Sequence, residues 1–260
     1  MTILDEIAAH ARARVAQDML RTSPEALMEL AAHAPYRAAF LDKVRQAGVA
    51  LICEVKKASP SKGVIDPVFD YMAIAADYEA AEADCISCLT EPKWFLGSDS
   101  IFGDIRRAVK TPMLRKDFVV DTYQLYQAKA MGADCALLIC ALHDTASLEK
   151  CLQICGRIGL DALVEAHDAR EIGMAVEAGA LMIGVNNRNL RDFTVDLDNA
   201  ARLRDLIPPG RYYVAESGVK GPEDAAKLKR LGADAILMGE TLMRAPDKRA
   251  ALRAIREAVT

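Results

Sequence analysis

The feature that most constrains this chain is a repeat of short apolar runs and amphipathic stretches that starts at Val49. The steps between successive apolar runs are 21 to 33 residues, long enough for one strand plus one helix and too short for much else. Eight such units in a row predict a closed (β/α)8 TIM barrel of the α/β class. The runs begin near Leu51, Asp84, Pro112, Asp134, Asp161, Met182, Tyr212 and Asp234.

The amphipathic stretches between the runs predict the helices. Gly-Ala-Asp recurs before two of the runs, at Gly132 and Gly232, as expected where a helix ends on glycine and the chain re-enters a sheet. An open, doubly wound sheet is the alternative, but its first turn is normally glycine-rich, whereas residues 57–61 read KASPS. Helices are expected at residues 67–81, 122–131, 145–157, 168–178, 197–206, 222–231 and 247–259.

Residues 2–48 predict a helical extension in front of the barrel. Apolar residues recur at helical spacing from Leu4 to Val15, and Ser23-Pro24 is typical of a helix start. A third helical segment is expected over residues 36–46, before Gly48. We therefore expect residues 1–260 to form a single domain, with the extension at 1–48 and the barrel at 49–260. The extension could seal apolar barrel surface, or it could border the active site.

Charge and hydropathy exclude several classes of partner. The formal net charge is −4, the pI is about 5.7, and the basic residues are scattered, so no nucleic acid is expected as a partner. No stretch approaches the roughly 18 uninterrupted apolar residues of a membrane span, so no membrane is expected either. The N-terminus lacks the basic and apolar regions of a signal peptide.

The cysteines and histidines predict no metal site. The seven cysteines are an odd number and lie mostly in apolar runs, which is typical of a reduced, cytoplasmic protein. Cys85 and Cys88 form a CxxC pair, but in a strand this spacing points the two sulfurs to opposite faces. No ligand pattern is formed by the histidines, which are His10, His33, His143 and His167.

Glu54 and Lys56 stand at the end of the first apolar run. Alternate residues of a strand share a face, so these side chains point the same way, with Val55 on the other face. An acid and a base at the end of a buried strand are costly unless they pair or do chemistry. Taken alone, the pair could equally mark a strand end that reaches water.

Four of the other predicted strands also end in charged residues. In a barrel of this class the active site lies at the carboxyl ends of the strands, here called the mouth. If each strand turns its last polar residue inward, three acids and three bases converge there. Such a set is hard to explain as structure, because each charge must be desolvated. The six residues are Glu54, Glu165, Glu216, Lys56, Lys116 and Arg188.

A phosphate site is predicted after the last two strands. Ser217-Gly218 follows the seventh strand, and Gly239-Glu240-Thr241 follows the eighth. Phosphate commonly binds at this place in barrels, on exposed backbone N–H groups and a helix N-terminus. The carboxylate of Glu240 is expected to point away from such an anion.

The order of the motifs resembles that of the indole-3-glycerol phosphate synthases. The resemblance covers the whole chain, including the extension, and the ordered set is specific although each motif alone is not. It rests on residues 54–61 (EVKKASPS), 114–118 (LRKDF), 163–165 (LVE), 184–190 (GVNNRNL) and 215–218 (AESG).

The resemblance implies a cofactor-independent and metal-independent carboxy-lyase of tryptophan biosynthesis. Its small-molecule substrate is phosphorylated, 1-(2-carboxyphenylamino)-1-deoxyribulose 5-phosphate, and its products are indole-3-glycerol phosphate, carbon dioxide and water. Some relatives are fused to phosphoribosylanthranilate isomerase. This chain ends after the eighth strand–helix unit, so no fused isomerase domain is expected.

The resemblance also implies roles for individual residues. Lys116 matches the general acid and Glu165 a second acid/base group. The other catalytic positions are Glu54, Lys56, Asn186 and Ser217. The substrate-binding positions are Ser59, Phe95, Phe118, Arg188, Leu190 and Glu216. The phosphate-binding positions are Ser217, Gly218, Gly239 and Glu240.

The chemistry suggests how these groups divide the work. Lys116 is expected to protonate the ketone oxygen during ring closure, with nearby cations and partial burial lowering its pKa toward neutrality. Lys56 or Arg188 would hold the carboxylate until it leaves. Glu165 and Glu54 are both candidates for the final dehydration. The alternatives are a sugar-phosphate isomerase on the same barrel and a non-catalytic scaffold.

Overall fold

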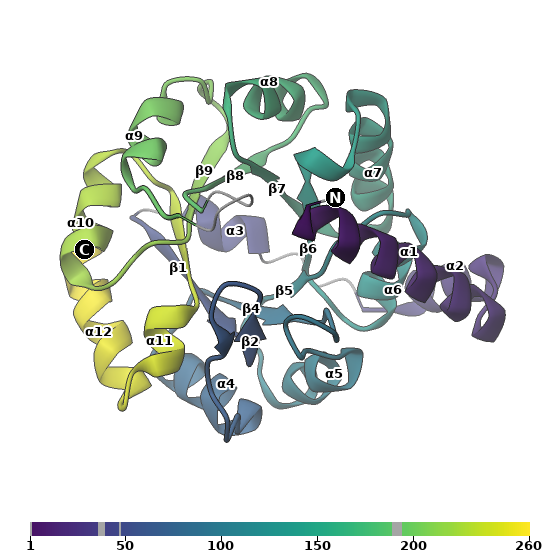
Figure 1. Ribbon diagram of the computed structural model, residues 1–260, viewed down its shortest axis with the longest axis horizontal. Coiled ribbons are helices and arrows are strands. Elements are labelled where there is room, and N and C mark those ends of the chain that lie inside the picture. Colours follow the sequence, from purple (N-terminus) through teal and green to yellow (C-terminus); the bar gives the residue numbers. More distant parts are fainter. Residues whose placement is uncertain (1, 36–39, 47, 189–193) are drawn as a thin grey trace.

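A computed structural model describes residues 2–35, 40–46, 48–188 and 194–260. Eight parallel strands close into a barrel in the order β1-β10-β9-β8-β7-β6-β5-β4, which confirms the predicted TIM barrel (Figure 1). Each strand begins within one residue of its predicted position. The strands are β1 (Ala50–Val55), β4 (Cys85–Leu89), β5 (Met113–Lys116), β6 (Cys135–Ile139), β7 (Asp161–Ala166), β8 (Met182–Asn186), β9 (Tyr212–Glu216) and β10 (Ala235–Met238).

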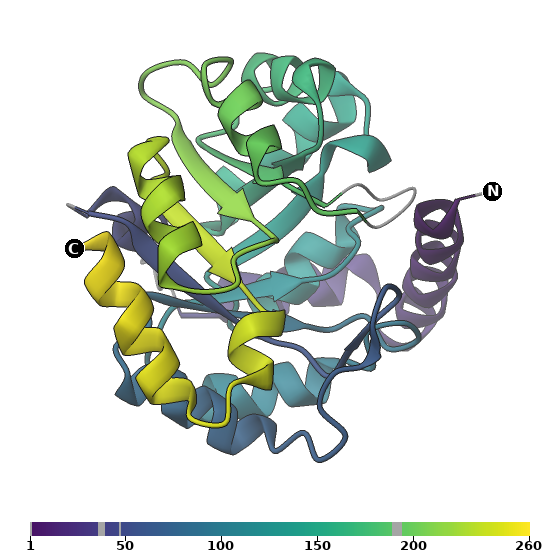
Figure 2. The same cartoon turned by 60° about the vertical axis from the view of Figure 1, so that its left-hand side comes forward.

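The helices surround the barrel, and most lie where the sequence predicts them (Figures 1 and 2). The first begins later than expected, at Tyr71, because Asp70 caps it by accepting from the N–H of Ala73. The helices of the barrel are α4 (Tyr71–Ala80), α5 (Asp99–Ala108), α6 (Tyr123–Ala130), α7 (Thr145–Ile158), α8 (Ala169–Glu177), α9 (Asp198–Arg204), α10 (Pro222–Arg230), α11 (Glu240–Arg244) and α12 (Lys248–Val259), with a short 3-10 helix, η1 (Cys140–Leu142).

Helix α5, the 3-10 helix η1 and a short hairpin were missing from the prediction. Helix α5 follows the loop after β4, and Ser98 caps it by accepting from the N–H of Ile101. A short hairpin of β2 (Ala58–Ser59) and β3 (Gly63–Val64) stands where a polar loop was expected. Its two strands are too short to show an alternating pattern in the sequence.

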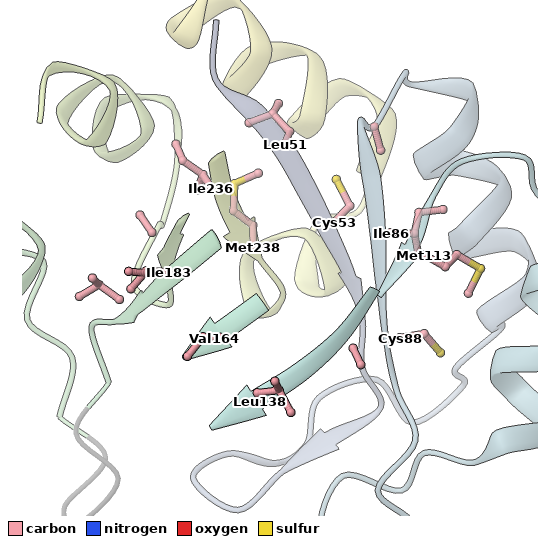
Figure 3. Packing of buried hydrophobic residues seen from close by; sticks show 14 of the residues in the cluster. Leu51, Cys53, Ile86, Cys88, Met113, Leu138, Val164, Ile183, Ile236 and Met238 are labelled. Carbon is pink, nitrogen blue, oxygen red and sulfur yellow. The ribbon is translucent and has the colours of Figure 1, made fainter. Parts of the chain in front are cut away.

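Alternation along each strand divides the core into two layers. On β1, Leu51 and Cys53 point outward, and Figure 3 shows them with Ile86 and Met113 among the side chains that pack outside the barrel. Ile52 points inward and belongs to a second cluster with the other inward-facing side chains. Continuing this alternation places Glu54, the next inward residue, at the mouth.

The extension has two separately placed parts. Helices α1 (Ile3–Arg21) and α2 (Pro24–His33) lie beside α6, where Val15, Leu27 and Tyr123 share a small apolar cluster. Helix α3 (Phe40–Arg45) lies at the opposite end of the barrel from the mouth. There the backbone N–H of Leu41 donates to Asp161 at the start of β7. Phe40 is fully buried against the inward-facing strand residues. A helical segment was expected over residues 36–46. Its first four residues, 36–39, lie outside the described part of the chain.

Over the described ranges, no helix combines the length and the apolar character needed to cross a membrane.

Candidate active site

A cavity of about 640 Å³ opens at the mouth, within the size range of small-molecule sites. It brings together every site residue that the sequence predicted, except Leu190, which lies outside the described residues. The cavity is lined by Glu54, Lys56, Ser59, Phe95, Lys116, Phe118, Glu165, Asn186, Arg188, Glu216, Ser217, Gly218, Gly239 and Glu240, among others.

The acids and bases of the mouth pair across strands. Lys56 forms an ion pair with Glu54 beside it on β1. Lys116 on β5 donates to Glu216 on β9 over 2.7 Å and lies 3.5 Å from Glu165 on β7. All three carboxylates are at least 96% buried, so each depends on its cation for stability.

The surroundings of Lys116 differ from the expected ones. Its nearest charged groups are carboxylates rather than cations. Burial alone lowers the pKa of this amine, but Glu216, Glu165 and Glu54 outweigh burial, and the pKa is raised above its ordinary value. The lysine is therefore protonated, and the expected shift toward neutrality is absent.

Glu165 and Glu216 differ strongly in acidity although they share Lys116. Burial raises the pKa of Glu216 to about 7, because Lys116 offsets only part of its lost hydration. Burial also disfavours the charge on Glu165, but Lys116, His167 and Asn186 together lower its pKa below the usual range. Glu165 is the ionised member of the two, and Glu216 can carry a proton near neutral pH.

His167 is the residue that sequence reasoning missed. Its Nε2 lies 3.2 Å from Glu165 Oε1, behind the cavity wall. The signal was present in the sequence, since His167 follows Glu165 by two residues and so shares its face. Arg188, the third base expected, lines the cavity with the other charged residues and lies 4.0 Å from Glu240.

Two glycines make room for the buried carboxylates. A Cβ on Gly184 of β8 would overlap the Glu216 carboxylate, and a Cβ on Gly239 would overlap that of Glu54 and crowd Lys56. Gly239 was predicted for phosphate binding. The structure shows another reason for a glycine at this position, because its Cα faces the ion pair of Glu54 and Lys56 on β1.

A buried carboxylate shapes the loop after β4. Glu91 is fully buried and accepts from the backbone N–H groups of Lys93, Trp94 and Phe95, at 2.7 to 3.0 Å. These bonds fix Phe95, whose ring lies 5.8 Å from that of Phe118. Both rings line the cavity and form an apolar wall.

Helix α1 borders the mouth, which decides between the two expected roles of this part of the extension. Ile3, Leu4 and Ile7 line the cavity. Arg14 Nη2 lies 2.6 Å from Oδ1 of Asp117, the buried neighbour of Lys116. Burial raises the pKa of Asp117, but Arg115 and Arg14 reverse this and lower it.

The predicted phosphate region carries both cations and an acid. Ser217 and Gly218 have left-handed backbones, with φ of 65° and 94°. Glu240 does not point away, as was expected, but lines the cavity. Its carboxylate lies 3.2 Å from Arg244 and 3.5 Å from Lys62, in addition to Arg188. Glu240 thus partly neutralises these cations.

Within the described residues, no group of three or more His, Cys, Asp or Glu side chains could hold a metal ion.

Comparison with known proteins identifies the family. The family model described as indole-3-glycerol phosphate synthase matches residues 4–255. The chain belongs to the indole-3-glycerol phosphate synthase family. A protein of this name from Ruminiclostridium cellulolyticum is 48% identical over 98% of both chains. One from Streptomyces griseus is 47% identical over 97% of this chain and 94% of its own, and one from Lacticaseibacillus paracasei is 44% identical over 98% and 99%.

Solved structures confirm the fold alone. A 3-hexulose-6-phosphate synthase superimposes with a TM-score of 0.67 at 15% identity, over 82% of this chain and 100% of its own. A thiamine phosphate pyrophosphorylase from Pyrococcus furiosus gives 0.60 at 18% identity, over 81% and 94%.

Family membership establishes the activity that the sequence predicted. The chain is a carboxy-lyase of tryptophan biosynthesis that carries out the family's decarboxylating ring closure.

Proposed function

We propose that the mouth of the barrel converts 1-(2-carboxyphenylamino)-1-deoxyribulose 5-phosphate into indole-3-glycerol phosphate with the charged residues in the roles described below. The observation that carries this proposal is the position of Lys116, which faces the cavity between Glu216 and Glu165. The reaction needs two protons delivered to the ketone oxygen, one at ring closure and one at dehydration, and one proton taken from a carbon, and this cluster holds both kinds of group.

Ring closure is the first step. The aryl carbon that bears the carboxylate attacks the ketone carbon, a carbon–carbon bond forms, and the ketone oxygen takes a proton from Lys116. The raised pKa of Lys116 does not prevent this, because the alkoxide that develops is a much stronger base than an amine. Glu216, with a pKa of about 7 and 2.7 Å away, can return a proton to the lysine.

Loss of carbon dioxide follows. The bond between the ring carbon and the carboxylate breaks, and its electron pair restores the aromatic ring. Until then the carboxylate must be held, a task we assign to Lys56 and Arg188, which line the same cavity. Since Lys56 is paired with Glu54, substrate binding has to loosen that pair.

Dehydration completes the indole. The hydroxyl made in the first step takes a second proton from Lys116, recharged by Glu216, and leaves as water. The adjacent carbon that came from the sugar loses a proton. Glu165 and Glu54 are the bases that face this space. Over the three steps the substrate loses one carbon dioxide and one water.

The rest of the cavity would hold the substrate in a bent conformation. Phe95 and Phe118 offer an apolar wall for the aromatic ring. We place the phosphate near Ser217 and Gly218, where Lys62 and Arg244 can be drawn from Glu240 to the ligand. Remote binding of this kind can be spent on orienting the reacting atoms.

We also propose that the chain works in the cytoplasm on this small phosphorylated molecule. All seven cysteines are free and buried, in keeping with a reducing compartment.

Replacement of Lys116 tests the proposal. Lys116→Ala should lower kcat about 10²- to 10⁴-fold while substrate still binds, because a general acid is lost. The measurement is the fluorescence of the indole product, which a sugar-phosphate isomerase or a scaffold would not make. Lys150→Ala, at an exposed site on α7, is the control. Near-normal turnover of Lys116→Ala would show that the acid is another group.

A further inference from the structure

We propose that His167, held in place by Glu171 of α8, is a positioning residue that fixes Glu165 as the base of the reaction. This inference rests on the proposed function and deepens it, because it divides roles that the cavity alone leaves shared between Glu165 and Glu54.

The histidine is held from two sides. Its Nδ1 lies 3.1 Å from Glu171 Oε2, and its backbone N–H donates to the same oxygen over 2.8 Å. Its Nε2 lies 3.2 Å from Glu165 Oε1. Glu171 is itself buried and lies in the first turn of α8. Its backbone N–H donates to the side chain of Asp168, the N-cap residue of this helix. The ring is therefore fixed in one orientation between two carboxylates.

This arrangement distinguishes the two oxygens of Glu165. The side-chain N–H of Asn186 donates to Oε1 over 3.1 Å, and His167 Nε2 lies 3.2 Å from the same oxygen. The other oxygen, Oε2, faces Lys116 at 3.5 Å. The histidine does not line the cavity, so its effect on the substrate must pass through Glu165.

The charges around the ring favour an imidazolium. Burial lowers the pKa of His167, but the Glu165 and Glu171 carboxylates more than reverse this and raise it to about 10. Asp168 at the start of α8 and Arg170, 3.6 Å from Glu171, are the other acidic and basic residues on that side. On η1, Cys140 faces Glu171 with a pKa raised to about 12, so it stays a neutral thiol.

The consequence concerns the state in which Glu165 begins each turnover. A cation on Oε1, added to Lys116 near Oε2, keeps this carboxylate ionised. It can then accept the carbon-bound proton during dehydration, but it cannot supply the proton for the departing hydroxyl at that moment. A histidine that only stabilised the fold would not restrict Glu165 to the role of base.

The pH dependence of kcat/KM separates these roles. His167→Gln keeps a polar group of similar length but removes the charge, so the acidic limb of the profile should move up by about one pH unit or more, and kcat should fall at least about tenfold with KM little changed. Glu171→Gln should shift the limb in the same direction by less. His33→Gln, an exposed histidine of α2, should leave the profile unchanged.

Nitrogen chemical shifts of the imidazole give a readout that does not depend on activity. His167 should be doubly protonated at pH 8 in the wild-type chain, and Glu165→Gln should lower its pKa. If His167→Gln does not fold, this measurement and Glu171→Gln still decide the matter. A neutral His167 ring at pH 8 would overturn the proposal.

Failure here can be told apart from failure of the proposed function. If Glu165→Gln retains normal turnover, Glu165 has no catalytic role and the proposed function is wrong at this residue. If Glu165→Gln is inactive but His167→Gln keeps both kcat and the acidic limb of the wild-type chain, only the role of His167 is refuted.

Discussion

At the scale of single residues, the site depends on the missing side chain of Gly184 as much as on its charged groups. The Glu216 carboxylate occupies the space that a side chain at position 184 would need. Glu216 in turn holds Lys116 at 2.7 Å. A glycine that does not line the cavity thus sets the position of the proposed general acid.

Gly184→Ala tests this dependence. The added methyl group must displace Glu216, so kcat should fall at least about tenfold, with about 1–3 kcal/mol lost from the free energy of unfolding. Gly173→Ala, in α8 where a Cβ meets nothing within 4 Å, should instead stabilise by about 0.5–1 kcal/mol and leave kcat unchanged. Kinetics and denaturant unfolding of both variants measure these effects. Equal kcat values in the two would contradict the argument.

His167 also predicts how stability depends on pH. Its pKa rises from the ordinary 6.5 to about 10 on folding, so its contribution to stability is complete below pH 6.5 and is lost as the pH rises through about 10. The free energy of unfolding should therefore decrease over this window, and His167→Gln should flatten that decrease. Denaturant unfolding at several pH values gives the comparison, with His33→Gln as the control. Parallel curves for wild type and His167→Gln would argue against the raised pKa.

At the scale of elements, α1 joins the extension to the chemistry. Its first turns supply apolar side chains to the cavity, and Arg14 in its middle reaches Asp117. Asp117 also accepts from Thr90 after β4 over 2.8 Å. One buried carboxylate therefore links α1, the loop after β4 and the strand that carries Lys116.

Arg14→Met should loosen this link. Asp117 would keep Arg115 but lose its 2.6 Å partner, so about 1–3 kcal/mol of stability should be lost and KM should rise as α1 moves from the mouth. Arg12→Met, two residues away on the exposed face of α1, should change neither. Thermal unfolding and steady-state kinetics check both values. An unchanged KM in Arg14→Met would mean that α1 borders the cavity without shaping it.

At the scale of the whole molecule, the barrel separates stability from catalysis along its axis. Phe40 of α3 fills the end opposite the mouth, in the same cluster as the inward-facing strand residues. Leu4 of α1 is only partly buried and lines the cavity. The extension thus contributes to both ends, and we propose that it and the barrel unfold as one domain.

Two truncations measure this separation. Phe40→Ala should cost about 3–5 kcal/mol in a single unfolding transition, with KM little changed. Leu4→Ala should raise KM several-fold and cost much less stability, because the side chain is already partly exposed. Calorimetry and steady-state kinetics on the same samples compare the two. Two separate transitions would contradict the single domain.

Much of the fold was predictable because strands and helices appear in the sequence as local periodicities of apolar residues. The strands were placed to within one residue, since each lies between a helix end and a turn that the sequence marks. Helix α5 and the β2–β3 hairpin were not, because the long loop after β4 and the very short strands carry little local pattern. The fixed position of Phe95 depends on the buried Glu91, which no local pattern reveals.

The sequence by itself determined which side chains reach the mouth, because a strand alternates with a period of two and a barrel places its strand ends on one face. Only the tertiary structure decided how they pair. Lys116 meets Glu216, 100 residues further along the chain, and Glu165 meets the histidine that the sequence left without a role. These pairings depend on barrel closure and on the burial of each group, and they set the pKa values. The sequence therefore identified the reactive groups, and the tertiary structure decided which of them are protonated.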